Sequence, residues 1–221
     1  APDLPYAGSQ VWDSDFLPAV YQGTRVLAGK EPIPNLSRRA LTEKIQQDEL
    51  DLLGRFNRGH FATRATDPNL AARMRSYETA FGMQREMPDA LDLSKETDAT
   101  LKLYGLERGG TKGFAWQCIV ARRLAERGVR FIELIDVGAS NNWDAHADMK
   151  THEPLARNID QAIAGLLRDL KSRGMLDDTL VVWTTEFGRT PSAEGSKGRG
   201  HFNRAFSSWL AGGGVKGGIV Y

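Results

Sequence analysis

Apolar residues recur every three or four positions over much of the chain, a spacing that is typical of amphipathic helices. The spacing predicts helices over residues 36–61, 67–85, 94–104, 111–127 and 153–173. We expect Asp67 to cap the second helix ahead of Pro68, and Pro88 to mark its end, because proline lacks a backbone donor. Residues 1–34 contain five prolines, which predicts an irregular segment. Its aromatic residues, Tyr6, Trp12, Phe16 and Tyr21, indicate that this segment packs on a larger body.

Short apolar runs interrupt this helical pattern in the second half of the chain. Residues 129–136 are rich in β-branched side chains, residues 179–185 are nearly all apolar, and residues 205–211 follow a long polar loop. Strands that alternate with helices favour crossover connections, and therefore parallel pairing. We expect an α/β fold with a mostly parallel sheet flanked by helices. A helical segment would precede the core strands.

This interpretation also divides the chain into parts. Residues 1–34 would form the irregular packed segment, residues 35–110 a helical insertion or cap, and residues 111–221 the α/β core. A chain of 221 residues is long enough to bury a sizeable core.

Composition and charge exclude several classes of protein. The 29 lysines and arginines nearly balance 28 acidic residues, so the net charge of +1 gives no case for a nucleic-acid-binding protein. No apolar run is long enough to predict a membrane span. The single cysteine, Cys118, rules out a disulfide framework and a zinc site built from several cysteines. Its place in a predicted helix makes it a core residue.

Candidate chemistry is concentrated in two polar loops that follow predicted strands. The first carries Asp144 and His146, and the second carries Glu186, Arg189 and His201. Ligands gather at the carboxyl ends of strands in open α/β sheets, and zinc, iron and manganese accept mixed imidazole and carboxylate ligands. The Asp-x-His spacing lets both side chains reach one ion from an extended stretch. The alternative is that these residues only form turns and caps.

Several stretches resemble the bacterial DUF1501 family, whose members are often described as sulfatase-like. The matching stretches cover nearly the whole chain: Phe16–Gln22, Ala90–Glu96, Gly128–Leu134, Asn142–His146, Leu166–Lys171, Gly174–Trp183, Glu186–Pro191 and Leu210–Gly218. The most specific of them is the string Glu-Phe-Gly-Arg-Thr-Pro that begins at Glu186. That family resembles a branch of the alkaline phosphatase superfamily, which implies an α/β fold with metals at the strand ends.

The resemblance implies roles for the candidate residues. Asp144, His146 and His201 match the superfamily's first metal site, which would hold a divalent metal such as zinc, with manganese, calcium or iron as alternatives. Glu186 would be a ligand or an acid/base, and Arg189 an anion clamp for a tetrahedral group. Phe187 stands where the second metal site has a histidine. The implied function is hydrolysis of sulfate or phosphate esters on a small molecule or a polysaccharide.

The resemblance assigns no nucleophile within this sequence. The superfamily's nucleophile precedes the stretch that this sequence matches, so we expect these residues to be the middle-to-late part of a longer chain. Export to the periplasm is implied by the family alone. The alternative function is a non-catalytic binding or scaffold protein that keeps the fold.

Overall fold

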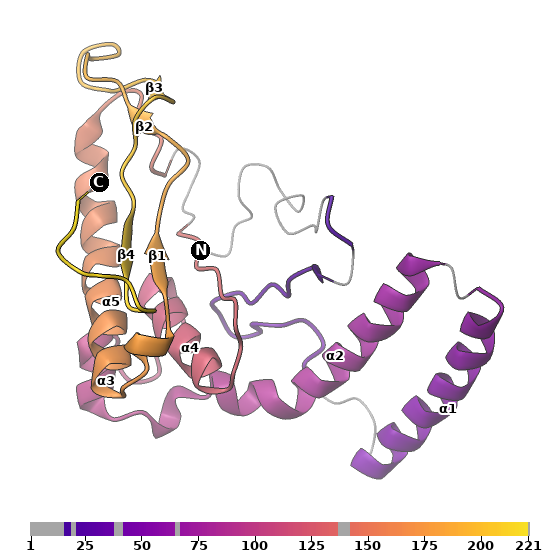
Figure 1. Cartoon of the computed structure of the whole chain (residues 1–221). Helices are drawn as coiled ribbons and strands as arrows, with labels where there is room; N and C mark the ends of the chain where they lie inside the picture. The colour runs from indigo at the N-terminus through magenta and orange to yellow at the C-terminus, as the bar shows by residue number, and fades with distance from the viewer. Residues whose placement is uncertain (1–15, 19–20, 38–41, 65–66, 137–141, 221) are drawn as a thin grey trace. The chain divides into compact units, whose positions relative to one another are not determined.

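The computed structural model describes residues 16–18, 21–37, 42–64, 67–136 and 142–220. The chain divides into two compact units, Pro2–Asp92 and Leu93–Tyr221 (Figure 1). No helix in the described ranges is long and apolar enough to cross a membrane, which agrees with the sequence prediction. Each unit is best understood from its own sequence.

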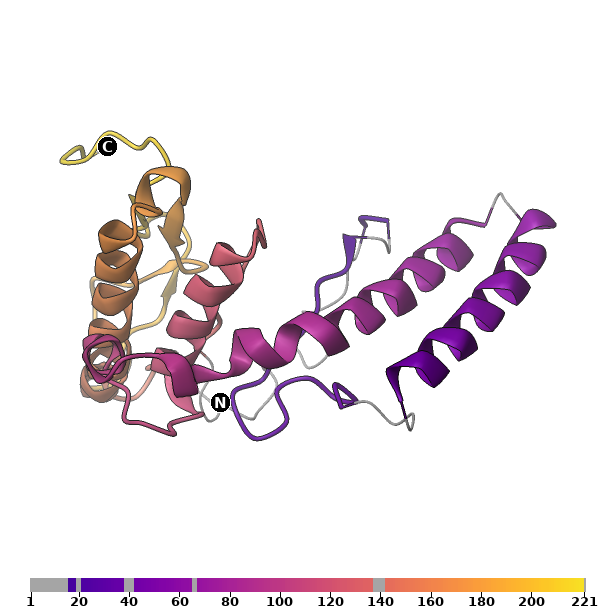
Figure 2. The ribbon, with the colours of Figure 1, turned by 90° about the horizontal axis from the view of Figure 1, so that it is seen from below.

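The first unit is built on an antiparallel pair of helices, α1 (Glu43–Ala62) and α2 (Pro68–Leu91) (Figures 1 and 2). Thr42 caps α1 by accepting a hydrogen bond from the Ile45 amide at 3.2 Å. A hydrogen bond of 2.6 Å from Gln46 to Gln84 joins the two helices. The described parts of residues 16–37 contain no α-helix or strand, as the prolines predict.

Of the two predicted ends of α2, the start is right and the end is wrong. Asp67 does cap α2, because its carboxylate accepts a hydrogen bond from the Leu70 amide at 3.2 Å. The prediction that Pro88 ends this helix is wrong, since α2 continues to Leu91. A proline one turn from the end removes a single hydrogen bond, which the last turn of a helix can tolerate.

The second unit has a core of three packed helices, α3 (Asp98–Tyr104), α4 (Gly113–Glu126) and α5 (His152–Ser172). A 3₁₀ turn, η3 (Leu93–Lys95), precedes them. Their buried apolar residues make the core: Leu101, Phe114, Trp116, Ile119, Val120, Ala162, Leu166 and Leu170. Cys118 is fully buried among them, which confirms its prediction as a core residue.

A close approach between α3 and α5 depends on one glycine. A Cβ atom at Gly165 of α5 would lie 2.7 Å from the backbone carbonyl oxygen of Leu103. Because backbone atoms cannot move aside cheaply, only glycine fits at this crossing. The amphipathic pattern of 153–173 therefore predicts the helix correctly, but not the partner that it packs against.

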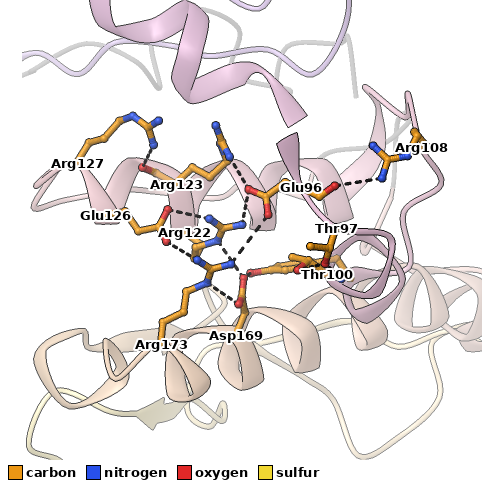
Figure 3. Close-up of polar contacts among 11 residues, drawn as sticks. Glu96, Thr97, Thr100, Arg108, Arg122, Arg123, Glu126, Arg127, Asp169 and Arg173 are labelled. Atoms are coloured by element: carbon orange, nitrogen blue, oxygen red, sulfur yellow. Dashed lines mark hydrogen bonds and ion pairs between the residues drawn. The ribbon is translucent and has the colours of Figure 1, made fainter. Parts of the chain in front are cut away.

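Buried charges join the same helices (Figure 3). Arg122 of α4 lies 2.8 Å from Glu96 and 3.0 Å from Asp169 of α5. Tyr104 of α3 donates a hydrogen bond of 2.9 Å to Asp169. Arg123 also pairs with Glu96. Burial alone would raise the pKa of Glu96, but the hydrogen bonds from Arg122 and Arg123 outweigh it and hold that pKa below its ordinary value.

The strands of the second unit are short and antiparallel. Strand β1 (Val181–Trp183) pairs with β4 (Trp209–Ala211), with Val182 opposite Leu210. Strand β2 (Gly188–Arg189) pairs with β3 (His201–Phe202). The 3₁₀ turns η4 (Met149–Thr151) and η5 (Leu176–Asp178) lie at the two ends of α5.

The predicted parallel sheet is therefore wrong. Parallel neighbours need a crossover, usually a helix, and the chain between β1 and β4 contains no helix. It runs out along β2 and back along β3, so β4 returns antiparallel to β1. Residues 129–136, predicted as a strand, have no ladder partner among the described residues. A nearly continuous apolar run predicts a strand covered on both faces, yet Val182 of β1 is 54% exposed.

Candidate metal site

The hairpin β2–β3 and the segment 142–148 bring the candidate residues together. The hairpin register places Arg189 directly opposite His201, so both side chains lie on one face. Backbone hydrogen bonds hold the second segment against the hairpin loop. The Arg199 amide donates to the Ala145 carbonyl at 3.1 Å, and the Met149 amide donates to the Lys197 carbonyl at 3.1 Å.

Gly198 makes this docking possible. A side chain at this buried position would overlap the backbone carbonyl of His146, one of the candidate ligands. The hairpin loop can therefore lie directly against the backbone of the Asp-x-His segment. The sequence places five residues of interest on two separate loops, and this contact brings the two loops to one site.

Three side chains point their donor atoms at a common centre. The Oδ1 atom of Asp144 lies 2.9 Å from the Nε2 atom of His146 and 3.0 Å from the Nε2 atom of His201. The two Nε2 atoms are 3.1 Å apart. Among the described residues, these three form a group that could hold a metal ion. The sequence prediction named the same three residues.

The spacing of these atoms fits a divalent cation. Tetrahedral zinc with ligand distances of about 2.0–2.1 Å sets its donor atoms about 3.3 Å apart. The three observed separations are only slightly shorter. The facing ring nitrogens can share only the protons that the rings carry, whereas a central cation accepts all three lone pairs at once. The residues therefore fit the group that the sequence predicts.

The site is open to solvent. The three side chains are between 41% and 49% exposed. Structural zinc sites are usually closed by four protein ligands, whereas catalytic sites combine three protein ligands with an open position. Three donors on side chains that are nearly half exposed resemble the second arrangement.

Asp144 is the most strongly perturbed acid of the site. It accepts hydrogen bonds from His201 and, at 2.6 Å, from the Nη1 atom of Arg189. These contacts, with His201 the larger, outweigh partial desolvation and lower the pKa of Asp144 to about 2. Its carboxylate is therefore ionised at neutral pH and ready to bind a cation.

Arg189, which the resemblance implies to be an anion clamp, contacts Asp144. Its Nη1 group is engaged by Asp144, and the guanidinium is largely buried. Its other N–H groups make no hydrogen bond to a described residue. The structure therefore gives Arg189 a role in holding Asp144 as well.

The structure does not bring Glu186 into the three-residue group. Its carboxylate accepts a hydrogen bond of 2.6 Å from the Thr185 hydroxyl. That bond is the main cause of a lowered pKa, and the charge of Arg189 contributes while burial and Asp144 oppose it. Glu186 is therefore ionised at neutral pH and cannot act as an acid there, and its lowered pKa also makes it a weaker base than an ordinary glutamate.

Phe187 packs against a candidate ligand. Its ring centroid lies 4.5 Å from that of His201 in a tilted arrangement. An apolar ring at this position supplies no metal ligand. It instead supports the orientation of the His201 imidazole from one side.

Sequence reasoning missed one residue of the site. Glu194 places its Oε2 atom 2.8 Å from the Nδ1 atom of His146, on the side of the ring that faces away from the other ligands. Its position in the polar loop carries no spacing signal, because the turn at 194–198 is what brings it back to His146. An acidic residue in a glycine-rich loop is ordinarily expected to face solvent rather than to contact another side chain.

A family model described as "Protein of unknown function (DUF1501)" matches residues 3–221 of this chain. The match covers nearly the whole sequence, so the chain belongs to the DUF1501 family. No curated protein and no solved structure matches the chain.

Proposed function

We propose that this DUF1501 protein is a metal-dependent hydrolase of sulfate or phosphate esters. The observation that carries the proposal is the convergence of Asp144, His146 and His201, whose donor atoms lie 2.9–3.1 Å apart in an exposed site. The likeness of these loops to sulfatase-like metal loops supports the ester substrate, on a small molecule or a polysaccharide.

The proposed ligands hold a divalent metal with one carboxylate and two imidazoles. A divalent metal supplies Lewis-acid stabilisation of the charge that develops during ester hydrolysis. Asp144 provides a fixed negative charge because its pKa is about 2. The half-exposed side chains leave room for a substrate to approach the metal from solvent.

Arg189 and Glu186 complete the proposed chemistry around the metal. The Nη1 group of Arg189 keeps Asp144 in place, and its remaining N–H groups bind an oxygen of the tetrahedral ester. Glu186, held ionised by Thr185, accepts a proton from the attacking group. Neither role requires the second metal that the superfamily uses. Phe187 beside His201 supports a site for a single metal ion.

The donor set favours a second candidate function. Two histidines and one carboxylate with open positions are also the ligands of non-haem Fe(II) oxygenases. The two candidates differ in the reaction that the metal-loaded protein performs. Ester hydrolysis favours the first candidate, and O₂ consumption by the iron-loaded protein favours the second.

The test is hydrolysis of p-nitrophenyl sulfate and p-nitrophenyl phosphate by the full chain loaded with zinc, manganese, calcium or iron. We expect Asp144→Ala and His146→Ala to lower kcat/KM by about 100-fold or more, because each removes a metal ligand. His60→Ala is the matched control, since this exposed histidine lies on α1 in the other unit. Wild-type activity and metal content in both site variants would refute the proposal.

A further inference from the structure

We propose that Glu194 is a positioning residue that fixes the tautomer of His146 and so prepares its Nε2 atom to bind metal. The inference rests on the metal site of the proposed function. It assigns a role to a residue that donates no ligand atom to that site.

The two ring nitrogens of His146 face different partners. The Nδ1 atom lies 2.8 Å from the Glu194 carboxylate, and the Nε2 atom lies 2.9 Å from Asp144. A neutral imidazole carries a single N–H group, and an ionised carboxylate can only accept a hydrogen bond. Both partners are carboxylates, but the Oδ1 atom of Asp144 already accepts hydrogen bonds from Arg189 and His201. We therefore expect the proton of His146 on Nδ1, where it faces Glu194. The lone pair of Nε2 then points toward Asp144 and His201.

The opposite tautomer would disable the ligand. A proton on Nε2 would point into the space between the three donor atoms and would have to leave before a metal bound. It would also leave the Nδ1 lone pair facing the Glu194 carboxylate. A carboxylate on the outer nitrogen of a metal-binding histidine orients the ring and raises its basicity, and losing such a partner typically costs 10–100-fold in metal affinity.

The backbone around Glu194 holds this carboxylate in place. The Glu194 amide donates a hydrogen bond of 3.0 Å to the Gly198 carbonyl, which closes the turn of the hairpin loop. The same loop is docked on the Asp-x-His segment through the Arg199 amide. Gly200 leaves room for the carboxylate, because a Cβ atom there would lie 2.9 Å from the Oε2 atom. The hairpin loop thus carries Glu194 and contacts the His146 backbone at once.

The experiment measures zinc affinity and the His146 tautomer in the full chain. Zinc dissociation constants are obtained by competition with a chromophoric chelator for the wild type, Glu194→Ala and Glu194→Gln. We expect Glu194→Ala to weaken zinc binding 10–100-fold. Glu194→Gln should weaken it less, because the amide oxygen still accepts from Nδ1. Glu153→Ala is the control, since Glu153 is an exposed residue of α5 paired with Arg157, and its zinc affinity should equal that of the wild type.

Nitrogen-15 NMR of the zinc-free protein reads the tautomer directly. We expect the proton of His146 on Nδ1 in the wild type and a shift toward Nε2 in Glu194→Ala. Wild-type zinc affinity in Glu194→Ala, or an Nε2 proton in the wild type, would overturn the inference. A wild type that binds no zinc, manganese, calcium or iron would refute the proposed metal site instead, and the tautomer measurement would still decide the role of Glu194.

Discussion

The residues of the candidate metal site show which functional side chains can be predicted from a sequence. Asp144, His146 and His201 could be named in advance, because carboxylate and imidazole are the usual donors for zinc and iron. Glu194 could not, since its role depends on a turn that no spacing rule describes. The buried charges on α4 and α5, Arg122, Arg123 and Asp169, also cannot be predicted from the sequence, because arginine and aspartate on a helix ordinarily face solvent.

Glu96 gives a prediction at this scale, because its low pKa links folding to pH. A carboxyl with a lowered folded pKa stabilises the protein above its unfolded pKa of about 4.3, and loses that effect as pH falls through the folded value. Glu96→Gln should lower the free energy of unfolding by about 3 kcal/mol at pH 7, since it removes the buried carboxylate that pairs with both Arg122 and Arg123.

Urea unfolding between pH 3 and pH 7 checks this prediction. The difference between the wild type and Glu96→Gln should shrink as the pH falls below the unfolded pKa of about 4.3, because the unfolded state then binds a proton that folded Glu96, with its lowered pKa, does not. Glu107→Gln, at an exposed position of the same unit, should behave like the wild type throughout. A difference that stays constant down to pH 3 would show that the charge of Glu96 is not what stabilises the fold.

Elements show where pattern reasoning succeeds and where it fails. The helices α1 to α5 follow from apolar spacing, and Asp67 and Pro68 mark one start correctly. The predicted strands at 179–185 and 205–211 contain β1 and β4, but their predicted parallel pairing is wrong, because strand direction depends on the connection rather than on the strand's own residues. Residues 129–136 have strand-forming composition without a pairing partner in the described chain, and composition alone cannot supply one.

The crossing of α3 and α5 gives a prediction at the scale of elements. Gly165→Ala should lower the free energy of unfolding by about 1–3 kcal/mol, because the new methyl group meets the Leu103 carbonyl and the helices must move apart. Ala156→Ser changes an exposed position of the same helix and should cost less than about 1 kcal/mol. Chemical denaturation measures both. An unchanged or higher stability of Gly165→Ala would contradict the close packing.

At the scale of the whole molecule, the proposed metal site lies in one of the two compact units. All the residues of the candidate site lie in Leu93–Tyr221, and so does the buried charge network. The sequence indicated helices in the first half and polar functional loops in the second. It misjudged the architecture, because three packed helices rather than a sheet form the core of the second unit.

The metal content of the purified protein is the most direct test of this account. Elemental mass spectrometry should find one divalent metal ion per chain in the wild type and in His60→Ala, and none in His201→Ala. Chelation should lower the Tm of the wild type, because a metal that binds the folded state stabilises it, and should leave the Tm of His201→Ala unchanged. A wild type that holds no metal and keeps its Tm after chelation would contradict the central claim.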